Sequence, residues 1–243
     1  MNIAIDLGNT HAKAGWFDGE RLVKQREKLD LTELSSLIVT DKPEHIVVSS
    51  VGQNYDEFVD VLQPNVPILT LTHSTPLPIR IAYATPHTLG ADRIAAAAGA
   101  KWLYPDQNVL IIDMGSCITY DSVSRDGVFL GGSISPGLRM RYKAMHTFTK
   151  RLPLLEPQET VPLVGQTTQE AMNSGVIHGL SAELNGLISA NLAALGNAQV
   201  VLCGGDALFF ESRIKHPIFV VPELVLIGLN TILRYNLSNE HTV

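Results

Sequence analysis

Cysteine is scarce in this sequence, and long apolar runs are absent from it. Its two cysteines, Cys117 and Cys203, form no C-x-x-C pair, which argues against a disulfide framework or a zinc site and is typical of a reducing cytoplasm. Both are expected to be small buried side chains. No stretch approaches ~20 uninterrupted apolar residues, so no membrane span is predicted. Since no basic segment followed by a long apolar run opens the chain, we expect no signal peptide and a cytoplasmic protein.

Positive charge is also in short supply. The 243 residues contain 18 Lys and Arg against 24 Asp and Glu, which gives a net charge of -6. This balance and the lack of a basic patch predict that the protein binds neither nucleic acid nor an anionic membrane surface. Hydrophobic residues make up 45% of the chain and charged residues 17%, so we expect a packed core.

Strand-like and helix-like patterns alternate along the chain, which predicts an α/β fold. Runs typical of strands span residues 2–6, 12–17, 45–51, 67–71 and 200–202. Helical spacing is found at residues 31–39, 55–62, 89–104 and 222–237, and the region 138–195 is expected to be mostly helical. In that region Gly175, Gly179 and Gly186 indicate close helix packing or contact with another backbone.

One plan of strand, polar turn and strand occurs twice in the sequence. The two copies read "IAIDLGNTHAKAGWFDGE" and "LIIDMGSCITYDSVSRDGV". In each, a strand ends in Asp, Gly follows two positions later, and a second strand runs to an Asp-Gly turn. The distances nearly match, from Asp6 to Asp18 and from Asp113 to Asp126. This internal repeat predicts two related domains, residues 1–107 and 108–243, with a boundary near "PDQN".

A lone D-x-G-N-T between two strands is usually a hairpin turn. Its repetition favours a second interpretation, because a glycine after a strand-terminal carboxylate lets backbone N–H groups approach an anion. Two such loops across a cleft would offer N–H donors and hydroxyls to phosphate oxygens, and two aspartates to hold cations. No GxxxxGK[ST] loop occurs. The repeat therefore indicates phosphoryl transfer without a lysine-bearing P-loop.

Several motifs together resemble type III pantothenate kinase, within the acetate and sugar kinase, heat-shock-70 and actin superfamily. "DLGNTHAK" is similar to the first phosphate motif of the family, and "DMGSCITYD" to its second, usually D-x-G-T-A-x-T-x-D. "IAYATPHTLGADR" is similar to its substrate motif, Y-x-x-P-x-x-L-G-x-D-R, while "GGSISPGL" and "TTQEAMNSG" also fit. The resemblance spans essentially the whole chain. It implies duplicated actin-like, ribonuclease H-like ATPase domains with a nucleotide cleft between them.

The resemblance also implies an activity. The protein would transfer the γ-phosphoryl group of ATP directly to the hydroxyl of pantothenate, giving 4'-phosphopantothenate in the first step of coenzyme A synthesis. Mg2+ would neutralise the phosphates, and a monovalent cation, K+ or NH4+, would complete the site. By the same resemblance the protein would be a homodimer with its sites at the interface. The helix from Glu170 to Leu195 is the candidate interface.

Nucleotide-site residues follow from the resemblance. Asp6 would lie near Mg2+, Asp113 would bind the monovalent cation, and Ser116 would touch a phosphate. Gly204 and Gly205, in the turn before Asp206 opens a helix, would lie against adenosine, although they could serve tight packing alone. The segment that would cradle the ATP phosphates consists of Asp6, Leu7, Gly8, Asn9, Thr10, His11, Ala12 and Lys13.

The pair Asp92–Arg93 is the candidate substrate site. A helix N-terminal aspartate beside a surface arginine is the simpler interpretation. A kinase acting on an alcohol, however, needs a carboxylate to accept the hydroxyl proton, and an arginine fork suits a substrate carboxylate. The family resemblance makes Asp92 the proton acceptor and places residues Gly90, Ala91, Asp92 and Arg93 on the substrate.

Two further residues would reach pantothenate by the same resemblance. Tyr83 would contact it, unless it is only a strand aromatic. Thr168 would reach it in the neighbouring subunit, although "TTQE" from Thr167 to Glu170 also has the spacing of a capping box.

The sequence departs from the family pattern at two places. Ser116-Cys117 replaces Thr-Ala, which keeps the hydroxyl, and "CGG" replaces the usual T-G-G, which removes one.

Two alternative functions stay open: a sugar kinase of the same superfamily, and a regulatory nucleotide-binding protein without catalysis. The presence of Asp6, Asp92, Arg93 and Asp113 together argues against the second alternative. His11 and His87 lie close to motifs but are given no catalytic role.

Overall fold

The computed structural model describes residues 1–8, 12–50 and 66–240. Its contacts divide the chain into two compact units. The first unit contains Met1–Asp106, Arg125–Leu130 and Glu223–Val243, and the second contains Gln107–Ser124 and Gly131–Pro222. The last helix in the sequence therefore packs within the first unit.

The first unit is built on a five-stranded sheet with the order β3-β2-β1-β4-β5. Its strands are β1 (Asn2–Leu7), β2 (Ala12–Asp18), β3 (Arg21–Leu29), β4 (His45–Ser50) and β5 (Ile68–Thr70). β1 is antiparallel to β2 and parallel to β4, and β4 is parallel to β5. Consecutive buried residues in β1 and β4, rather than an alternating pattern, indicate a sheet covered on both faces.

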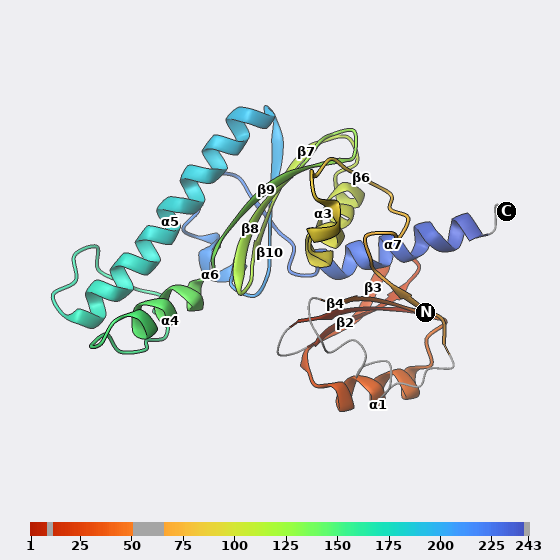
Figure 1. Cartoon of the computed structure of the whole chain (residues 1–243), viewed down its shortest axis with the longest axis horizontal. Coiled ribbons are helices and arrows are strands. Elements are labelled where there is room, and N and C mark those ends of the chain that lie inside the picture. The colour runs from red at the N-terminus through yellow and green to blue at the C-terminus, as the bar shows by residue number, and fades with distance from the viewer. Residues whose placement is uncertain (9–11, 51–65, 241–243) are drawn as a thin grey trace. The chain divides into compact units, whose positions relative to one another are not determined.

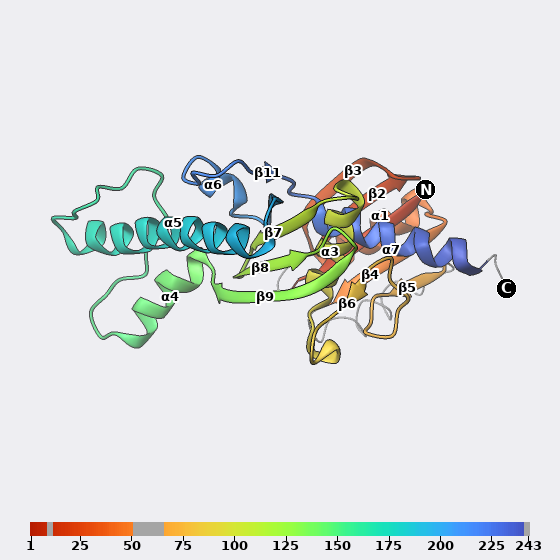
Figure 2. The same ribbon diagram turned by 90° about the horizontal axis from the view of Figure 1, so that it is seen from above.

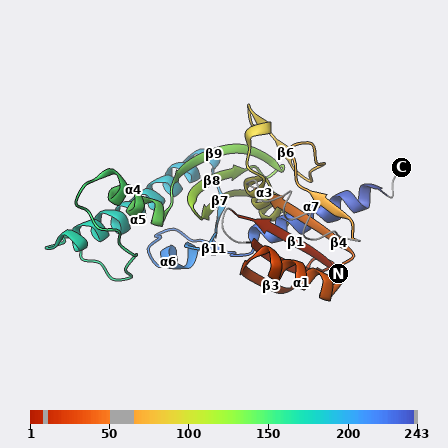
Figure 3. The same cartoon turned by 60° about the horizontal axis from the view of Figure 1, so that its bottom comes forward.

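Helices supply that cover. α1 (Leu31–Asp41) begins at Asp30 with a capping box, in which Asp30 and Glu33 each accept from the other's backbone N–H. Figures 1 and 3 show α1 on one face of this sheet, and α3 (Ala91–Leu103) with α7 (Leu224–Glu240) on the other. α3 and α7 cross closely because both carry a glycine at the crossing. A Cβ on Gly228 would lie 1.7 Å from the carbonyl oxygen of Ala95, and one on Gly99 would lie 2.5 Å from that of Leu224.

The second sheet has the order β11-β10-β7-β8-β9-β6. Its strands are β6 (Arg80–Ile81), β7 (Asn108–Met114), β8 (Cys117–Val123), β9 (Val128–Pro136), β10 (Ala198–Cys203) and β11 (Phe219–Val220). β7 is antiparallel to β8 and parallel to β10, which is parallel to β11. The order β9-β8-β7-β10-β11 thus repeats β3-β2-β1-β4-β5, including the directions of these pairs. The repeated sequence plan corresponds to a repeated topology, and the predicted α/β class is confirmed.

The connection from β9 to β10 carries the main helices of the second unit, α4 (Leu138–Phe148) and α5 (Thr168–Leu195), which run side by side in Figure 2. A short helix, α6 (Ala207–Glu211), follows β10, and a 3-10 turn at Pro86–Thr88 precedes α3 in the first unit. The core of the second unit forms where α4, α5 and α6 meet β7, β8 and β10.

The region 138–195 is mostly helical, as predicted: α4 and α5 fill it except for residues 149–167, which contain three prolines that cannot donate helix hydrogen bonds. Two other expectations about the second unit need correction. Within the described part of the chain, a Cβ on Gly175, Gly179 or Gly186 would meet nothing within 4 Å, so these glycines serve no close packing there. Cys203 is buried as expected, but Cys117 is exposed. The predicted helix at 55–62 and residue 51 of the third predicted strand lie outside the described residues.

Candidate functional site

The first hairpin places a carboxylate beside its turn. In the β1–β2 register Asp6 is opposite Lys13 and Leu7 is opposite Ala12, so β1 ends and β2 begins at this place. Gly8 follows β1, and Asn9, Thr10 and His11 lie outside the described residues. On the parallel neighbour β4, the buried hydroxyl of Ser49 donates to Asp6 Oδ1 at 2.6 Å. Lys13 forms an ion pair with Glu27 at 2.9 Å.

Burial is the main influence on Asp6. It raises the pKa of the Asp6 carboxyl by removing water from the charged form, and the negative charge of Asp92 raises it further. The hydrogen bond from Ser49 and the charge of Lys13 oppose this rise. The structure therefore brings Asp6 and Asp92, which are 86 positions apart in the sequence, within electrostatic reach of each other. The negative charge concentrated there fits a divalent cation held by Asp6 and phosphate oxygens.

Asp92 lies in the first turn of α3, where Gly90 is the N-cap residue and Ala91 begins the helix. The Asp92 Oδ1 atom accepts from the backbone N–H of Arg93 at 2.8 Å. A Cβ on Gly90 would lie 2.4 Å from the same oxygen. Glycine at position 90 thus leaves room for the carboxylate to fold back over the start of the helix.

Arg93 is buried, with 7% of its surface exposed, so the simpler interpretation of a surface arginine is wrong. Its guanidinium carbon lies 5.9 Å from the ring centre of Tyr83 and 5.8 Å from that of Phe129. The two rings contact each other edge to face at 6.1 Å. Tyr83 and Arg93, both predicted substrate residues, are therefore packed together, and these stacking contacts suit a guanidinium better than an ammonium.

A pocket of about 300 Å³ adjoins the start of α3. Its walls include His73, His87, Gly90 and Ala91, with the remaining lining from Leu71, Thr72, Thr88, Leu89 and Ile94. This volume is within the lower range for small-molecule sites, ~300 Å³ and above. The substrate motif thus has a recess beside it large enough for a small ligand.

The second hairpin has a tighter connection, since Met114 pairs with Ile118 and the turn consists of Gly115, Ser116 and Cys117. The backbone N–H of Gly115 donates to the Cys117 carbonyl at 3.0 Å. Asp113 lies at the end of β7, opposite Thr119 in the register.

Two other segments pack against this turn through glycines. The N–H of Gly137 donates to the carbonyl of Ser116 at 3.1 Å, and a Cβ at position 137 would lie 2.4 Å from that oxygen. Gly204 has a φ of +87°, and a Cβ there would lie 2.4 Å from Asp113 Oδ1, so tight packing does require Gly204. A Cβ on Gly205 would meet no atom of the described residues within 4 Å, which leaves that side of the turn open to a ligand.

An ion pair that no local sequence pattern predicts lies beside this turn. Arg139 Nη1 lies 2.7 Å from Asp206 Oδ1, and the N–H of Asp206 donates to the carbonyl of Met114 at 3.0 Å. Arg139 is in the first turn of α4, and Asp206 is the N-cap residue of α6. Their 67-residue separation and the lack of a local pattern explain why sequence reasoning missed them.

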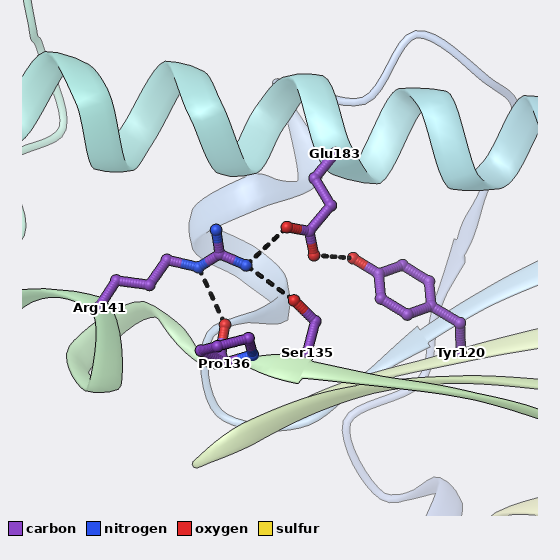
Figure 4. A network of polar contacts seen from close by, with 5 residues as sticks. All are labelled: Tyr120, Ser135, Pro136, Arg141 and Glu183. Atoms are coloured by element: carbon purple, nitrogen blue, oxygen red, sulfur yellow. Dashed lines mark hydrogen bonds and ion pairs between the residues drawn. The ribbon is translucent and has the colours of Figure 1, made fainter. Parts of the chain in front are cut away.

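A polar network anchors the strands behind the turn to α5 (Figure 4). Arg141 donates to the Pro136 carbonyl at 2.9 Å, to Ser135 Oγ at 2.9 Å and to Glu183 Oε2 at 2.7 Å. The Tyr120 hydroxyl donates to Glu183 Oε1 at 3.0 Å. β8, the end of β9 and α4 are thereby tied to one carboxylate on α5.

The pKa values in this network follow from its contacts. Burial alone would raise the pKa of Glu183, but hydrogen bonds from Ser135 and Arg141, the charge of Arg141 and the hydrogen bond from Tyr120 lower it overall. Burial, followed by the charge and hydrogen bond of Glu183, raises the pKa of Tyr120, which stays protonated as a donor.

At the start of α5 the predicted capping box is confirmed. Thr167 is the N-cap residue; its hydroxyl accepts from the N–H of Glu170 at 3.2 Å, and Glu170 Oε2 accepts from the N–H of Thr167 at 3.2 Å. Thr168 is the exposed first residue of the helix, available to a ligand or a partner.

Within residues 1–8, 12–50 and 66–240, no three His, Cys, Asp or Glu side chains gather as a ready metal site. No helix in those ranges has the length and apolarity needed to cross a membrane.

Comparison with solved structures identifies the fold. A protein from Campylobacter jejuni, described as a conserved putative Baf family transcriptional activator, matches with a TM-score of 0.66 at 24% identity, over 97% of this chain and 99% of that one. The Lmo2764 protein of Listeria monocytogenes, described as a putative N-acetylmannosamine kinase, matches with a TM-score of 0.55 at 13% identity, over 97% of this chain and 99% of that one. The repeated topology of the two sheets and the similarity to these structures identify a fold of duplicated actin-like domains.

Comparison with curated proteins identifies the family. Residues 2–190 match the family model described as type III pantothenate kinase. The type III pantothenate kinase of Cytophaga hutchinsonii is 44% identical over 236 residues, covering 97% of this chain and 100% of that protein. The one from Phocaeicola vulgatus is 41% identical over 241 residues, covering 97% and 99%. The chain therefore belongs to the type III pantothenate kinase family.

Proposed function

We propose that this protein phosphorylates pantothenate with ATP, giving 4'-phosphopantothenate in the first step of coenzyme A synthesis. Family membership over nearly the full length is the observation that carries the proposal. The electrostatic coupling of Asp6 to Asp92 supports it, because a kinase needs a carboxylate near the phosphates and another near the acceptor hydroxyl.

Asp92 is the proton acceptor in this mechanism. Its carboxylate takes the proton of the substrate hydroxyl as the hydroxyl oxygen bonds to the γ-phosphorus and ADP leaves, with no covalent enzyme intermediate. Asp6 holds Mg2+ directly or through water, and the bound ion neutralises charge on the phosphate oxygens. The backbone from Asp6 to Lys13 cradles those oxygens.

The substrate lies against the start of α3. Gly90, Ala91 and Tyr83 contact it, and Arg93 binds its carboxylate. Support comes from the buried cluster of Arg93 with Tyr83, since a guanidinium away from bulk water binds a carboxylate more strongly than an exposed one does.

The second turn also contributes residues to nucleotide binding. Asp113 binds a monovalent cation, K+ or NH4+, Ser116 contacts a phosphate, and Gly204 with Gly205 lies against adenosine. The open side of Gly205 supports the last assignment.

The protein acts as a cytoplasmic homodimer, without nucleic-acid or membrane partners. α5 is the proposed interface, and Thr168 of one copy reaches the substrate of the other. The open faces of Gly175, Gly179 and Gly186 support this role, because glycines that pack on nothing in the described chain leave room for another backbone.

The first experiment is ADP release by the purified protein with MgATP and pantothenate, run in parallel with potassium and with sodium. Pantothenate-dependent turnover that needs potassium is the expected result. Turnover in both salts would keep the kinase and remove the potassium assignment at Asp113. Turnover in neither, or only with a sugar acceptor, would overturn the proposed function.

A further inference from the structure

The ion pair between Arg139 and Asp206 lies at the rim of the second turn. We propose that Arg139 is a further nucleotide ligand: its guanidinium leaves Asp206 and binds a phosphate of ATP when the nucleotide enters. The inference rests on the proposed function, since it assumes that the phosphates approach Ser116.

Backbone contacts fix both ends of this ion pair to the turn. Two residues before Arg139, Gly137 donates to the carbonyl of Ser116. On the other side, Asp206 donates its own N–H to the carbonyl of Met114. A side chain on Gly137 or Gly204 would collide with the turn, so both segments are packed directly against it. Arg139 is thus a cation held next to a turn proposed to bind anions.

The two partners differ strongly in exposure. The Arg139 side chain is 68% exposed, while that of Asp206 is 13% exposed. The guanidinium can therefore turn toward a ligand, whereas the carboxylate stays in place. An arginine fork offers five N–H donors, and the contact with Asp206 is made by one nitrogen, Nη1.

Arg141, two residues further along α4, provides a contrast. Its three bonds to Pro136, Ser135 and Glu183 hold it in the network of Figure 4. Arg141 anchors the helix, and Arg139 presents a charge at its exposed start. The neighbouring arginines thus have separable roles, which a substitution at each can distinguish.

If Arg139 exchanges Asp206 for a phosphate of ATP, substitutions of Arg139 and of Asp206 should have opposite effects on MgATP binding. Removing Arg139 removes a phosphate ligand, so R139A should weaken MgATP binding about tenfold, with R139K in between. Removing the charge of Asp206 removes the competitor for Arg139 and a repulsive charge, so D206N should strengthen binding about two- to fivefold. A purely structural ion pair would shift both variants in the same direction.

The measurement is calorimetric titration of MgATP without pantothenate, together with the KM for ATP. The matched control is R234A, because Arg234 pairs with Glu20 at the same 2.7 Å and is also partly exposed, but lies on α7 of the first unit. Its affinity for MgATP should equal that of the wild type, and thermal melts check that all variants are folded.

Unchanged affinity in R139A, or weakening in D206N equal to that in R139A, would overturn the inference. These outcomes are independent of the acceptor. If the wild type binds MgATP but does not phosphorylate pantothenate, the proposed function fails while the binding series still decides the role of Arg139. Absence of MgATP binding by the folded wild type would overturn both.

Discussion

The two hairpins occupy equivalent places in their sheets but have different surroundings. Asp6 is paired across β1 and β4 with Ser49, whose hydroxyl donates to it; in the equivalent register between β7 and β10, Asp113 faces Cys203. The first turn region has a coupled carboxylate, Asp92, near it. The second is held by close backbone packing of glycines. The two copies share a topology, but the first hairpin has two carboxylates close together and the second has glycine-mediated backbone packing.

The proposed mechanism places proton transfer in the first unit, and the strongest way to test it is to neutralise one carboxylate. Asp92→Asn should lower kcat about 10²–10⁴-fold, because the amide cannot accept the hydroxyl proton. MgATP binding should persist, since Asp92 is not a phosphate ligand in this proposal. Steady-state kinetics and calorimetry on the same preparation separate the two effects. Asp113→Asn is the matched variant in the other copy, and it should alter cation dependence more than kcat at saturating potassium.

Near-normal turnover by Asp92→Asn would remove the proton-acceptor role. If Asp113→Asn lost as much kcat as Asp92→Asn under saturating potassium, the proposed division of labour between the copies would be wrong.

Glycines offer a second comparison, between α7 and α5. Gly228→Ala should destabilise the protein by about 2–4 kcal/mol, because the new methyl would overlap the Ala95 carbonyl where α7 crosses α3. Gly175→Ala meets no described atom and should stabilise a monomer by up to about 1 kcal/mol through helix propensity. Chemical denaturation measures both.

The proposed dimer makes Gly175 informative in a second way. Loss of dimer in sedimentation of Gly175→Ala, with the monomer as stable as expected, would support the proposed α5 interface. A fully dimeric, active variant would argue against close backbone contact at that position.

Local patterns predicted much of this architecture. The hairpins, α1, α3 and the capping box at Thr167 follow from residue types a few positions apart, so the sequence carries their signals directly. The burial of Arg93 does not follow in this way, since it depends on Phe129, which is 36 positions away, and on Tyr83. The Arg139–Asp206 pair likewise depends on long-range packing. The crossing of α3 and α7 requires matched glycines at positions 99 and 228, and neither position predicts the other.

The adjacent glycines of the second turn give a third, smaller effect. Gly204→Ala should cost about 2–3 kcal/mol, because alanine disfavours a φ of +87° and its Cβ would overlap Asp113. Gly205→Ala should leave the free energy of unfolding within about 0.5 kcal/mol, since its Cβ would meet nothing within 4 Å. The proposed contact with adenosine predicts a raised KM for ATP in Gly205→Ala. Equal stability of the two variants would contradict the tight packing assigned to Gly204.

The pH dependence of stability gives the smallest expected difference between the units. Glu183 has a lowered pKa in the folded protein, so its contribution is present above the unfolded value of 4.5 and is lost as pH falls through the folded value. Asp6 has a raised pKa, so its ionisation costs stability as pH rises from 3.8 through the folded value. Glu183→Gln should therefore lose about 1 kcal/mol at pH 7 and less near pH 4, whereas Asp6→Asn should gain stability at pH 7 and little near pH 4. Denaturation at both pH values measures these slopes, and slopes of the same sign in the two variants would contradict the assigned pKa directions. Opposite slopes would mean that the ionised carboxylate of Asp6 costs stability in the first hairpin, where it is proposed to serve the reaction. The hydrogen-bonded carboxylate of Glu183 would instead stabilise the strands next to the second hairpin.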